Sequence, residues 1–242
     1  EAQEFFNNLD FVGDSNFRDI GVSKISKKLY YRFFHYYTLK HWGIDPSELP
    51  SSIFNRLPIR YNMDTRYFSD KYQGMPNLGY TDMITNILNH KNISIKFNSE
   101  IDKSLVNNEK VYFTGSIDQY YEYKFGKLPY RSVRHEWSNE DLGCATLNHC
   151  DLKTPYTRQI CFNYFYPDID MDTFYTATEY AIDSDIDHLP LYPIPLQKNI
   201  DLYNKYKNEP SNVIFAGRLG IYKYINMDAA IANAMKVVRE SL

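Results

Sequence analysis

Apolar residues recur at helical spacing near the start of the chain. From about Ser23 to Lys40 they share one face without proline or glycine, which predicts a helix ending at Trp42–Gly43. The residues on this face are Ile25, Leu29, Phe33 and Tyr36. Asp45–Pro46 predicts a short helix with proline in its first turn, and Pro50 closes or restarts it. We therefore expect residues 1–66 to form a helical subdomain.

The pattern changes after a turn-rich link. Thr81 is placed to cap a helix. The apolar face of that helix consists of Met83, Ile84, Ile87 and Leu88. In residues 93–97 apolar and polar side chains alternate, which predicts a strand, and residues 111–114 form a short apolar run that Gly115 ends. Residues 67–122 are thus expected to contain a link, a helix and strands.

Residues 123–205 are rich in short aromatic and β-branched stretches bounded by Asp, Asn and Pro, which indicates an antiparallel sheet. The stretches include residues 145–148, 159–164 and 174–180. The final part, 206–242, has a buried strand over 212–217 and a helix beginning at Asn226 or Asp228. The fold class expected from these patterns is mixed α/β, with α+β character.

The strand, loop and helix N-terminus of the final part have two interpretations. This order of elements makes a site for an anionic or electron-rich ligand. Many α/β proteins also end in this way without a ligand, and the pattern alone does not choose between the two.

Composition excludes several classes of function. The formal charge of -3 and the even spread of 27 basic and 30 acidic residues argue against a nucleic-acid partner. Three cysteines without paired spacing predict neither a disulfide framework nor a metal site, so a cytoplasmic location is expected. No apolar run approaches the ~20 residues that cross a bilayer, so membrane insertion is not expected.

Aromatic residues make up 17% of the chain. They fit either tyrosine packing in cores and at edges, which composition alone favours, or a cleft that stacks on a base or sugar. Four arginines lie beside tyrosine, proline or glycine in turn-like contexts: Arg56, Arg131, Arg158 and Arg218. Guanidinium groups bind diphosphates with bidentate geometry, although surface salt bridging is the commoner role of a single arginine.

Six stretches resemble the successive motifs of UDP-galactopyranose mutases, in order and at matching spacing. They are YTLKHWG (37–43), NRLPIR (55–60), RYFSDKYQGMP (66–76), GSIDQY (115–120), PYTR (155–158) and GRLGIYKY (217–224). Together they extend over nearly the whole chain. The sequence therefore resembles the substrate-binding and C-terminal part of this family.

The resemblance implies an activity. Members of this family interconvert UDP-galactopyranose and UDP-galactofuranose for galactofuranose-containing polysaccharide, as intramolecular transferases that use reduced FAD. N5 of the flavin attacks the anomeric carbon, UDP leaves, and the flavin–sugar adduct lets the sugar ring reopen and close through its other hydroxyl. UDP-galactose is the implied substrate. A homodimer is compatible with the family, whose members are often dimers.

The resemblance also implies roles for individual residues. Arg56 and Arg158 would grip the diphosphate and act in catalysis, while Tyr37 would stack on the uracil with Trp42 lining the same pocket. The hydroxyl groups of Tyr67, Tyr192 and Tyr224 would donate to phosphate oxygens. Arg131 would contact the nucleotide-sugar region, and Arg218 the flavin. The further substrate-binding residues are Tyr67, Arg131, Tyr192, Tyr224 and Asn226. The cofactor-binding residues are Gly217, Arg218 and Met227.

By this resemblance, residues 1–66 are the helical substrate-binding subdomain and 67–122 return the chain to an FAD-type domain. Residues 123–205 form the antiparallel substrate sheet, and 206–242 supply the final strand and helix of a Rossmann-like FAD-binding domain. The family's βαβ unit with its G-x-G-x-x-G loop has no counterpart here. This chain alone is therefore expected to bind FAD weakly or not at all, unless a longer parent chain or a second polypeptide supplies that unit.

Several positions depart from the family pattern. Asn226 stands where aspartate is usual, Cys161–Phe162 follows the PYTR motif where Glu-His is common, and Leu191 replaces a tyrosine. Two alternatives therefore accompany the mutase interpretation. One is a non-catalytic nucleotide-sugar-binding remnant or truncated mutase without FAD. The other is a mutase that acts on a different UDP-sugar, such as UDP-N-acetylgalactosamine.

Overall fold

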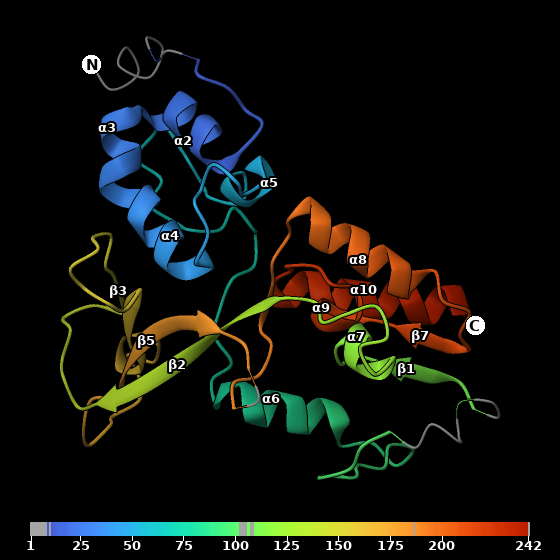
Figure 1. Ribbon diagram of the computed structural model, residues 1–242. Helices are drawn as coiled ribbons and strands as arrows, with labels where there is room; N and C mark the ends of the chain where they lie inside the picture. The colour runs from blue at the N-terminus through green and yellow to red at the C-terminus, as the bar shows by residue number, and fades with distance from the viewer. Residues whose placement is uncertain (1–8, 10, 102–105, 107–108, 186, 242) are drawn as a thin grey trace.

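The structure is a computed structural model that describes residues 9, 11–101, 106, 109–185 and 187–241. Figure 1 shows three parts: a group of helices in blue, an antiparallel sheet in yellow and orange, and a smaller group of helices around a two-stranded sheet in green and red. Mixed α/β character is therefore confirmed.

The first part is a helical group in which one bend was not predicted. It contains α2 (Phe17–Ile25), α3 (Lys27–Tyr30), the π-helix η1 (Tyr31–His35), α4 (Tyr36–Trp42) and α5 (Ser51–Phe54). The helix expected from Ser23 to Lys40 forms from residue 27 onward, but Ser26 has φ 76° and separates α2 from α3. The predicted end is confirmed, because Gly43 adopts a left-handed conformation with φ 65°.

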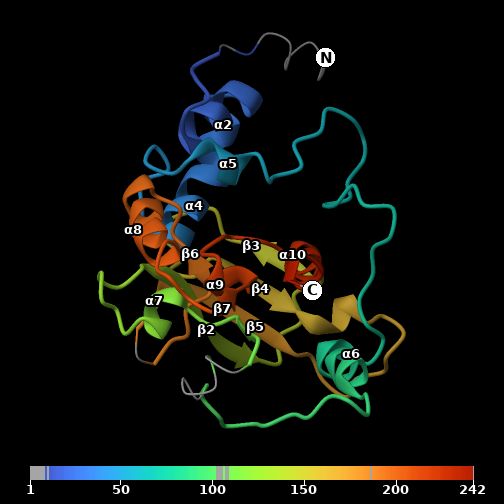
Figure 2. The same ribbon diagram turned by 90° about the vertical axis from the view of Figure 1, so that its right-hand side faces the viewer.

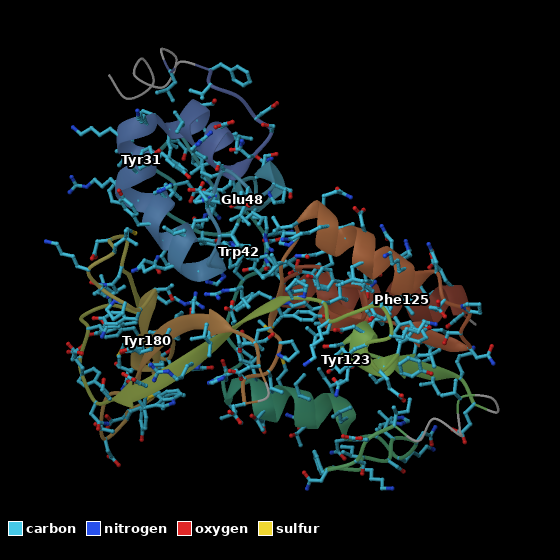
Figure 3. The ribbon with its side chains drawn as sticks, viewed as in Figure 1. Tyr31, Trp42, Glu48, Tyr123, Phe125 and Tyr180 are labelled. Atoms are coloured by element: carbon cyan, nitrogen blue, oxygen red, sulfur yellow. The ribbon has the colours of Figure 1, made fainter. Side chains whose placement is uncertain are left out.

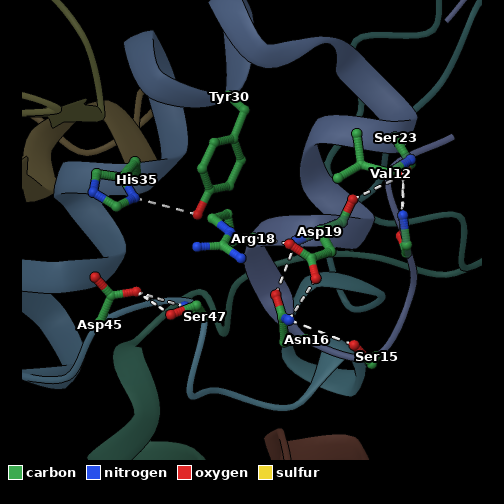
Figure 4. A network of polar contacts seen from close by, with 11 residues as sticks. Val12, Ser15, Asn16, Arg18, Asp19, Ser23, Tyr30, His35, Asp45 and Ser47 are labelled. Atoms are coloured by element: carbon green, nitrogen blue, oxygen red, sulfur yellow. Dashed lines mark hydrogen bonds and ion pairs between the residues drawn. The ribbon is translucent and has the colours of Figure 1, made fainter. Parts of the chain in front are cut away.

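Two details of the helical prediction are wrong. Asp45–Pro46 begins a turn, in which Asp45 Oδ1 accepts hydrogen bonds from the backbone N (2.8 Å) and Oγ (2.6 Å) of Ser47 (Figure 4). The helices also end at Phe54, and Figure 2 shows the segment from there to residue 78 as a long stretch without regular structure. The first eight residues of the predicted subdomain, and residue 10, lie outside the described part.

An aromatic core holds the helical part together. Its buried members are Phe17, Ile20, Ile25, Tyr30, Trp42, Leu49, Phe54 and Ile194. Gly21 is required here, since a Cβ on it would lie 2.6 Å from a ring carbon of Tyr30. Ile194 follows the last strand of the antiparallel sheet, so this core fixes the helices to the sheet.

Helix α6 (Gly79–Leu88) confirms that a helix forms here, but the predicted cap is wrong: the N-cap residue is Leu78, and Thr81 lies inside the helix. The strand expected at residues 93–97 is wrong, because these residues have no regular structure and their apolar side chains Ile93, Ile95 and Phe97 are exposed. Alternation favours a strand only where a neighbouring strand accepts its backbone hydrogen bonds. In the part of the chain that the structure describes, no strand pairs with this segment.

The antiparallel sheet expected in residues 123–205 is confirmed. Its strand order is β3-β4-β5-β2-β6. The strands are β2 (Tyr130–Ser138), β3 (Thr146–Asn148), β4 (Arg158–Cys161), β5 (Thr176–Asp183) and β6 (Tyr192–Pro193). The stretch 159–164 is only partly a strand, since Phe162–Phe165 forms the 3-10 helix η3. Pairing of β4 with β5 places Arg158 opposite Glu179.

The third part confirms the predicted final strand and helix. β1 (Val111–Phe113) pairs in parallel with β7 (Val213–Phe215), and α7 (Ile117–Tyr120), α9 (Gly217–Gly220) and α10 (Met227–Ser241) surround them. Helix α8 (Gln197–Lys207) was not predicted. It is largely polar, and only a narrow stripe that includes Asn199 and Tyr206 is buried, so its helical periodicity is weak.

Within the described residues, none of the helices has both the length and the apolar character that crossing a bilayer requires.

Candidate functional site

Aromatic rings from three segments meet where the helical part contacts the sheet. Tyr37 and His41 of α4 lie with parallel ring planes (6°) and centroids 6.2 Å apart. His41 meets the ring of Tyr192 in β6 at 5.0 Å, and Tyr192 meets the ring of Tyr224 at 5.4 Å. We call Tyr37, His41, Tyr192 and Tyr224 the ring cluster. It is the centre of the candidate site.

Arg56 approaches the ring cluster from the loop after α5. Its Cζ lies 3.7 Å from the centroid of the Tyr224 ring, and its Nη1 donates to the Tyr224 carbonyl at 3.0 Å. Its Nη2 donates to Oδ1 of Asn226. The asparagine therefore holds this guanidinium group without neutralising its charge, whereas an aspartate would neutralise it.

Arg158 lies on the sheet side of the ring cluster and pairs with a buried carboxylate. Its Nη2 donates to Glu179 Oε2 at 2.8 Å, and the Glu179 side chain is only 3% exposed. Thr157 Oγ1 donates to the Glu179 backbone oxygen at 3.0 Å. His135 Nε2 lies 3.6 Å from the same carboxylate oxygen, Oε2. Glu179 thus fixes one edge of the arginine fork.

Two buried nitrogen atoms of the site have no hydrogen-bond partner among the described residues. They are Nε of Arg158 and Nδ1 of His41. Burying such groups without a partner costs free energy, and unpartnered buried groups in native proteins are few. Their presence beside the ring cluster indicates a place for a ligand that accepts hydrogen bonds from Arg158.

Arg218 completes the site from the short helix α9. Its Nε and Nη2 donate to the Ile225 carbonyl at 3.1 and 2.6 Å, and its Nη1 donates to the Leu191 carbonyl at 3.0 Å. Its Cζ lies 5.4 Å from the Tyr192 ring centroid and 5.2 Å from that of Tyr224. Arg218 therefore ties the chain before α10 to β6 and keeps these two rings together.

Three other residues that the resemblance implicated, Trp42, Arg131 and Tyr67, lie at the edge of the ring cluster or away from it. Trp42 is 3% exposed in the helical core and meets Tyr224 edge-on at 5.7 Å; Figure 3 labels it at the end of α4. Arg131 donates to the carbonyls of Lys40 and His41 and pairs with Asp183, which is a packing role. Tyr67 is 57% exposed beside Phe68 in the irregular segment.

Gly217 and Met227 lie at the third part of the fold. Gly217 begins α9 with φ 72°, a conformation that favours glycine, and its N–H donates to Asn233 Oδ1 at 3.2 Å. Met227 is the exposed first residue of α10. Each is the chain neighbour of a residue already described, Arg218 for Gly217 and Asn226 for Met227.

Sequence reasoning did not select Glu179 or His41. His41 lies inside a quoted motif, but its burial between rings is a property of the folded chain. Glu179 had one signal in the sequence, since it is the only charged side chain in the stretch 174–180 that was predicted to be a strand. A carboxylate in such a stretch requires a partner if it is buried.

Burial shifts the pKa values of Tyr37 and His41. It raises the pKa of Tyr37 to about 12, so this hydroxyl stays protonated and able to donate at neutral pH. It lowers the pKa of His41 from 6.5 to about 4, so this imidazole is neutral at pH 7.

His41 gives a prediction for stability against pH. Its folded pKa lies below the unfolded value, so the unfolded chain binds the extra proton between about pH 6.5 and 4. The stabilisation is complete above pH 6.5 and is lost as the pH falls through this range. Urea unfolding should therefore show a smaller loss of stability between these two pH values in His41→Gln than in the unaltered protein. Equal losses in both proteins would contradict this assignment.

Comparison with known proteins gives the family. The family model described as UDP-galactopyranose mutase matches residues 32–224. A probable UDP-galactopyranose mutase of Klebsiella pneumoniae is 39% identical, over 96% of this chain and 62% of the relative. A dTDP-fucopyranose mutase of Escherichia coli is 35% identical, over 91% of this chain and 62% of the relative. A crystal structure of reduced UDP-galactopyranose mutase matches with a TM-score of 0.67 at 13% identity, over 98% of this chain and 70% of that one.

The ring cluster and its arginines thus lie in a fold of the nucleotide-sugar mutase class. The chain belongs to the UDP-galactopyranose mutase family. It spans 62% of the length of the first two relatives. The fold agrees with that of the solved mutase, and the resemblance found in the sequence motifs is confirmed.

Proposed function

We propose that this chain is the substrate-binding part of an FAD-dependent mutase that interconverts UDP-galactopyranose and UDP-galactofuranose. The observation that carries the proposal is the approach of Arg56 and Arg158 to one ring cluster from different elements, with Nε of Arg158 buried and unpartnered. Two guanidinium groups beside stacked aromatic rings suit a nucleotide diphosphate. Galactofuranose-containing polysaccharide is the proposed destination of the product.

The two arginines would act on the leaving group. Charge grows on the phosphate oxygen as the bond between the anomeric carbon and UDP breaks, and fixed cations stabilise that charge without reorganising. Arg158 is held by Glu179 on one side, which leaves Nε to donate to the phosphate. Arg56 keeps its full charge, because its side-chain partner Asn226 is neutral.

The aromatic residues would orient the nucleotide. Tyr37 is the proposed stacking partner of the uracil, since its ring lies parallel to that of His41, which in turn meets Tyr192 of β6. Tyr192 and Tyr224 are proposed to donate their hydroxyl groups to phosphate oxygens, and burial raises the pKa of Tyr192. Tyr67 is proposed as a further donor. It is exposed, so the loop that carries it would have to move towards the site.

Two residues are proposed to support these contacts. Trp42 packs edge-on against Tyr224 and so fixes the ring beside Arg56. Arg131 holds the carboxyl end of α4 on the sheet through the carbonyls of Lys40 and His41. We propose that its contribution to the nucleotide-sugar region is made through this positioning.

Part of the flavin site is also proposed to lie on this chain. Gly217 has a backbone open to close approach, Met227 is exposed at the start of α10, and Arg218 places a cation between the rings of Tyr192 and Tyr224. We propose that these residues border one edge of a flavin ring; this sequence contains no G-x-G-x-x-G loop to hold the dinucleotide. When bound, reduced FAD would supply the nucleophile for the anomeric carbon, with no net oxidation of the sugar.

The test is turnover by the full-length native protein. After reduction with dithionite, it should carry flavin absorbance and convert UDP-galactofuranose to UDP-galactopyranose. A protein without flavin or turnover that still binds UDP would contradict the mutase and support the nucleotide-sugar-binding module instead.

A second candidate is a mutase for another nucleotide sugar. The similarity to a dTDP-fucopyranose mutase, at 35% identity, favours it specifically. Comparison of kcat/KM for UDP-galactofuranose and dTDP-fucofuranose separates the two, and UDP-N-acetylgalactosamine can be included in the same series. Preference for the dTDP-sugar would replace the first proposal.

Location and assembly are also proposals. Within the described part, Cys144, Cys150 and Cys161 are free thiols, which suits a reducing cytoplasm. A homodimer is proposed only because members of the family are often dimers. Sedimentation of the full-length protein tests this proposal.

A further inference from the structure

Lys40 makes an unusual set of contacts outside the proposed ligand contacts. It lies on α4, and its Nζ donates to three backbone carbonyls of one loop, those of His149 (2.8 Å), Thr154 (3.0 Å) and Tyr156 (2.7 Å). An ammonium group has three N–H donors, so this loop uses all of them. Each bond has a charged donor, which makes it stronger than a bond between neutral groups.

The loop held by Lys40 leads directly to Arg158. It connects β3 with β4, and Tyr156 is two residues before the arginine. Other bonds join this loop to itself or to the start of β4. Asp151 Oδ1 accepts from the backbone N of Lys153 (2.8 Å) and Thr154 (2.9 Å), and His149 pairs through Nε2 with Gln159 Oε1 (3.1 Å). These bonds shape the loop and join it to the sheet, but their partners do not lie on α4.

A second contact also holds α4, with the donor on the sheet and the acceptor on the helix. Arg131 of β2 donates to the backbone oxygens of Lys40 and His41 at the end of α4. The end of α4 is therefore bound at two places. The Lys40 side chain binds the loop between β3 and β4, and the Lys40 carbonyl group accepts from Arg131 of β2. Tyr37 lies one turn before Lys40 on the same helix, so the proposed uracil contact and the proposed phosphate contact share this junction.

We propose that Lys40 is a positioning residue that fixes the loop 149–156 and thereby sets the distance between Arg158 and Tyr37. It does not touch the nucleotide in this account. The inference rests on the proposed function for the identity of the ligand, but the restraint of the loop by Lys40 is independent of it. Without the ammonium group, three carbonyls lose their partner and the loop can move away from α4.

The experiment compares Lys40→Met with a matched control, Lys28→Met, in the full-length protein. Lys28 is an exposed lysine of the same helical part. Hydrogen exchange followed by mass spectrometry measures the loop, and calorimetric titration with UDP measures binding. Lys40→Met should raise the exchange rate of amides in residues 149–157 while α2 and α8 keep their protection. UDP affinity should fall about tenfold, the effect expected if the displaced Arg158 loses one charge-assisted bond to the nucleotide.

Unchanged exchange in residues 149–157 would overturn the inference, and so would a loosened loop with unchanged UDP affinity. A uniform rise in exchange over all helices would also contradict it, because that result indicates a general loss of stability. If Lys40→Met does not fold, Lys40→Gln retains two donors and should show a smaller effect of the same kind. If the unaltered protein binds no UDP, the proposed function fails, and the exchange comparison still decides whether Lys40 restrains the loop.

Discussion

Arg158→Ala should lower kcat for UDP-galactofuranose about 10²–10³-fold in the full-length, reduced protein, the typical cost of removing one fixed donor to a developing oxyanion. The reason is that Arg158 presents a buried, unpartnered Nε beside the ring cluster. Arg158→Lys should recover little of this loss, because an ammonium group cannot pair with Glu179 and a phosphate through a planar fork. Steady-state kinetics with product separation measure the effect.

Arg134→Ala is the matched control for this experiment. Arg134 lies on the neighbouring part of the same sheet, is 43% exposed and pairs with Glu136. Exposed pairs of this kind contribute about 0–1 kcal/mol to stability, so the control should retain its turnover. A loss of activity in Arg134→Ala equal to that in Arg158→Ala would show that general damage to the sheet causes both, and would remove the special role of Arg158.

Glu179→Gln should destabilise the protein by about 3 kcal/mol, since removing one partner of a buried ion pair leaves the other charge uncompensated. Glu179 is paired to Arg158 at 2.8 Å and also lies 3.6 Å from His135. The same substitution should lower UDP affinity, because Arg158 loses the contact that fixes its orientation. Urea unfolding and UDP titration measure the two effects.

Glu136→Gln serves as the control for Glu179, since it removes an exposed carboxylate 54% open to solvent on the adjacent strand. Its unfolding free energy should change by less than about 1 kcal/mol. If Glu179→Gln changes stability no more than Glu136→Gln does, the buried pair is not an important part of the site.

The sequence motifs selected residues that the structure brings to the ring cluster. Arg56 and Tyr224 are far apart in the chain, yet both were selected because each lies in a stretch that resembles the family. The partner of Arg158 could not be found in the same way. Glu179 is 21 residues away, and only the register between β4 and β5 brings the two side chains together.

The errors in the fold have a common physical cause. The alternation in residues 93–97 predicted a strand, but a strand needs a neighbour, and sequence periodicity does not show whether one exists. Helix α8 was missed for the opposite reason, because it is mostly polar and the packing of a few residues such as Tyr206 stabilises it. In both cases tertiary contacts outweighed the local pattern.

A crystal structure of the full-length protein with UDP tests the central claim most directly, namely that the ring cluster and its two arginines hold a nucleotide diphosphate. The account predicts phosphate oxygens about 3 Å from the guanidinium nitrogens of both Arg56 and Arg158, with the uracil stacked on Tyr37. UDP bound elsewhere, with neither arginine within hydrogen-bond distance of a phosphate oxygen, would contradict it.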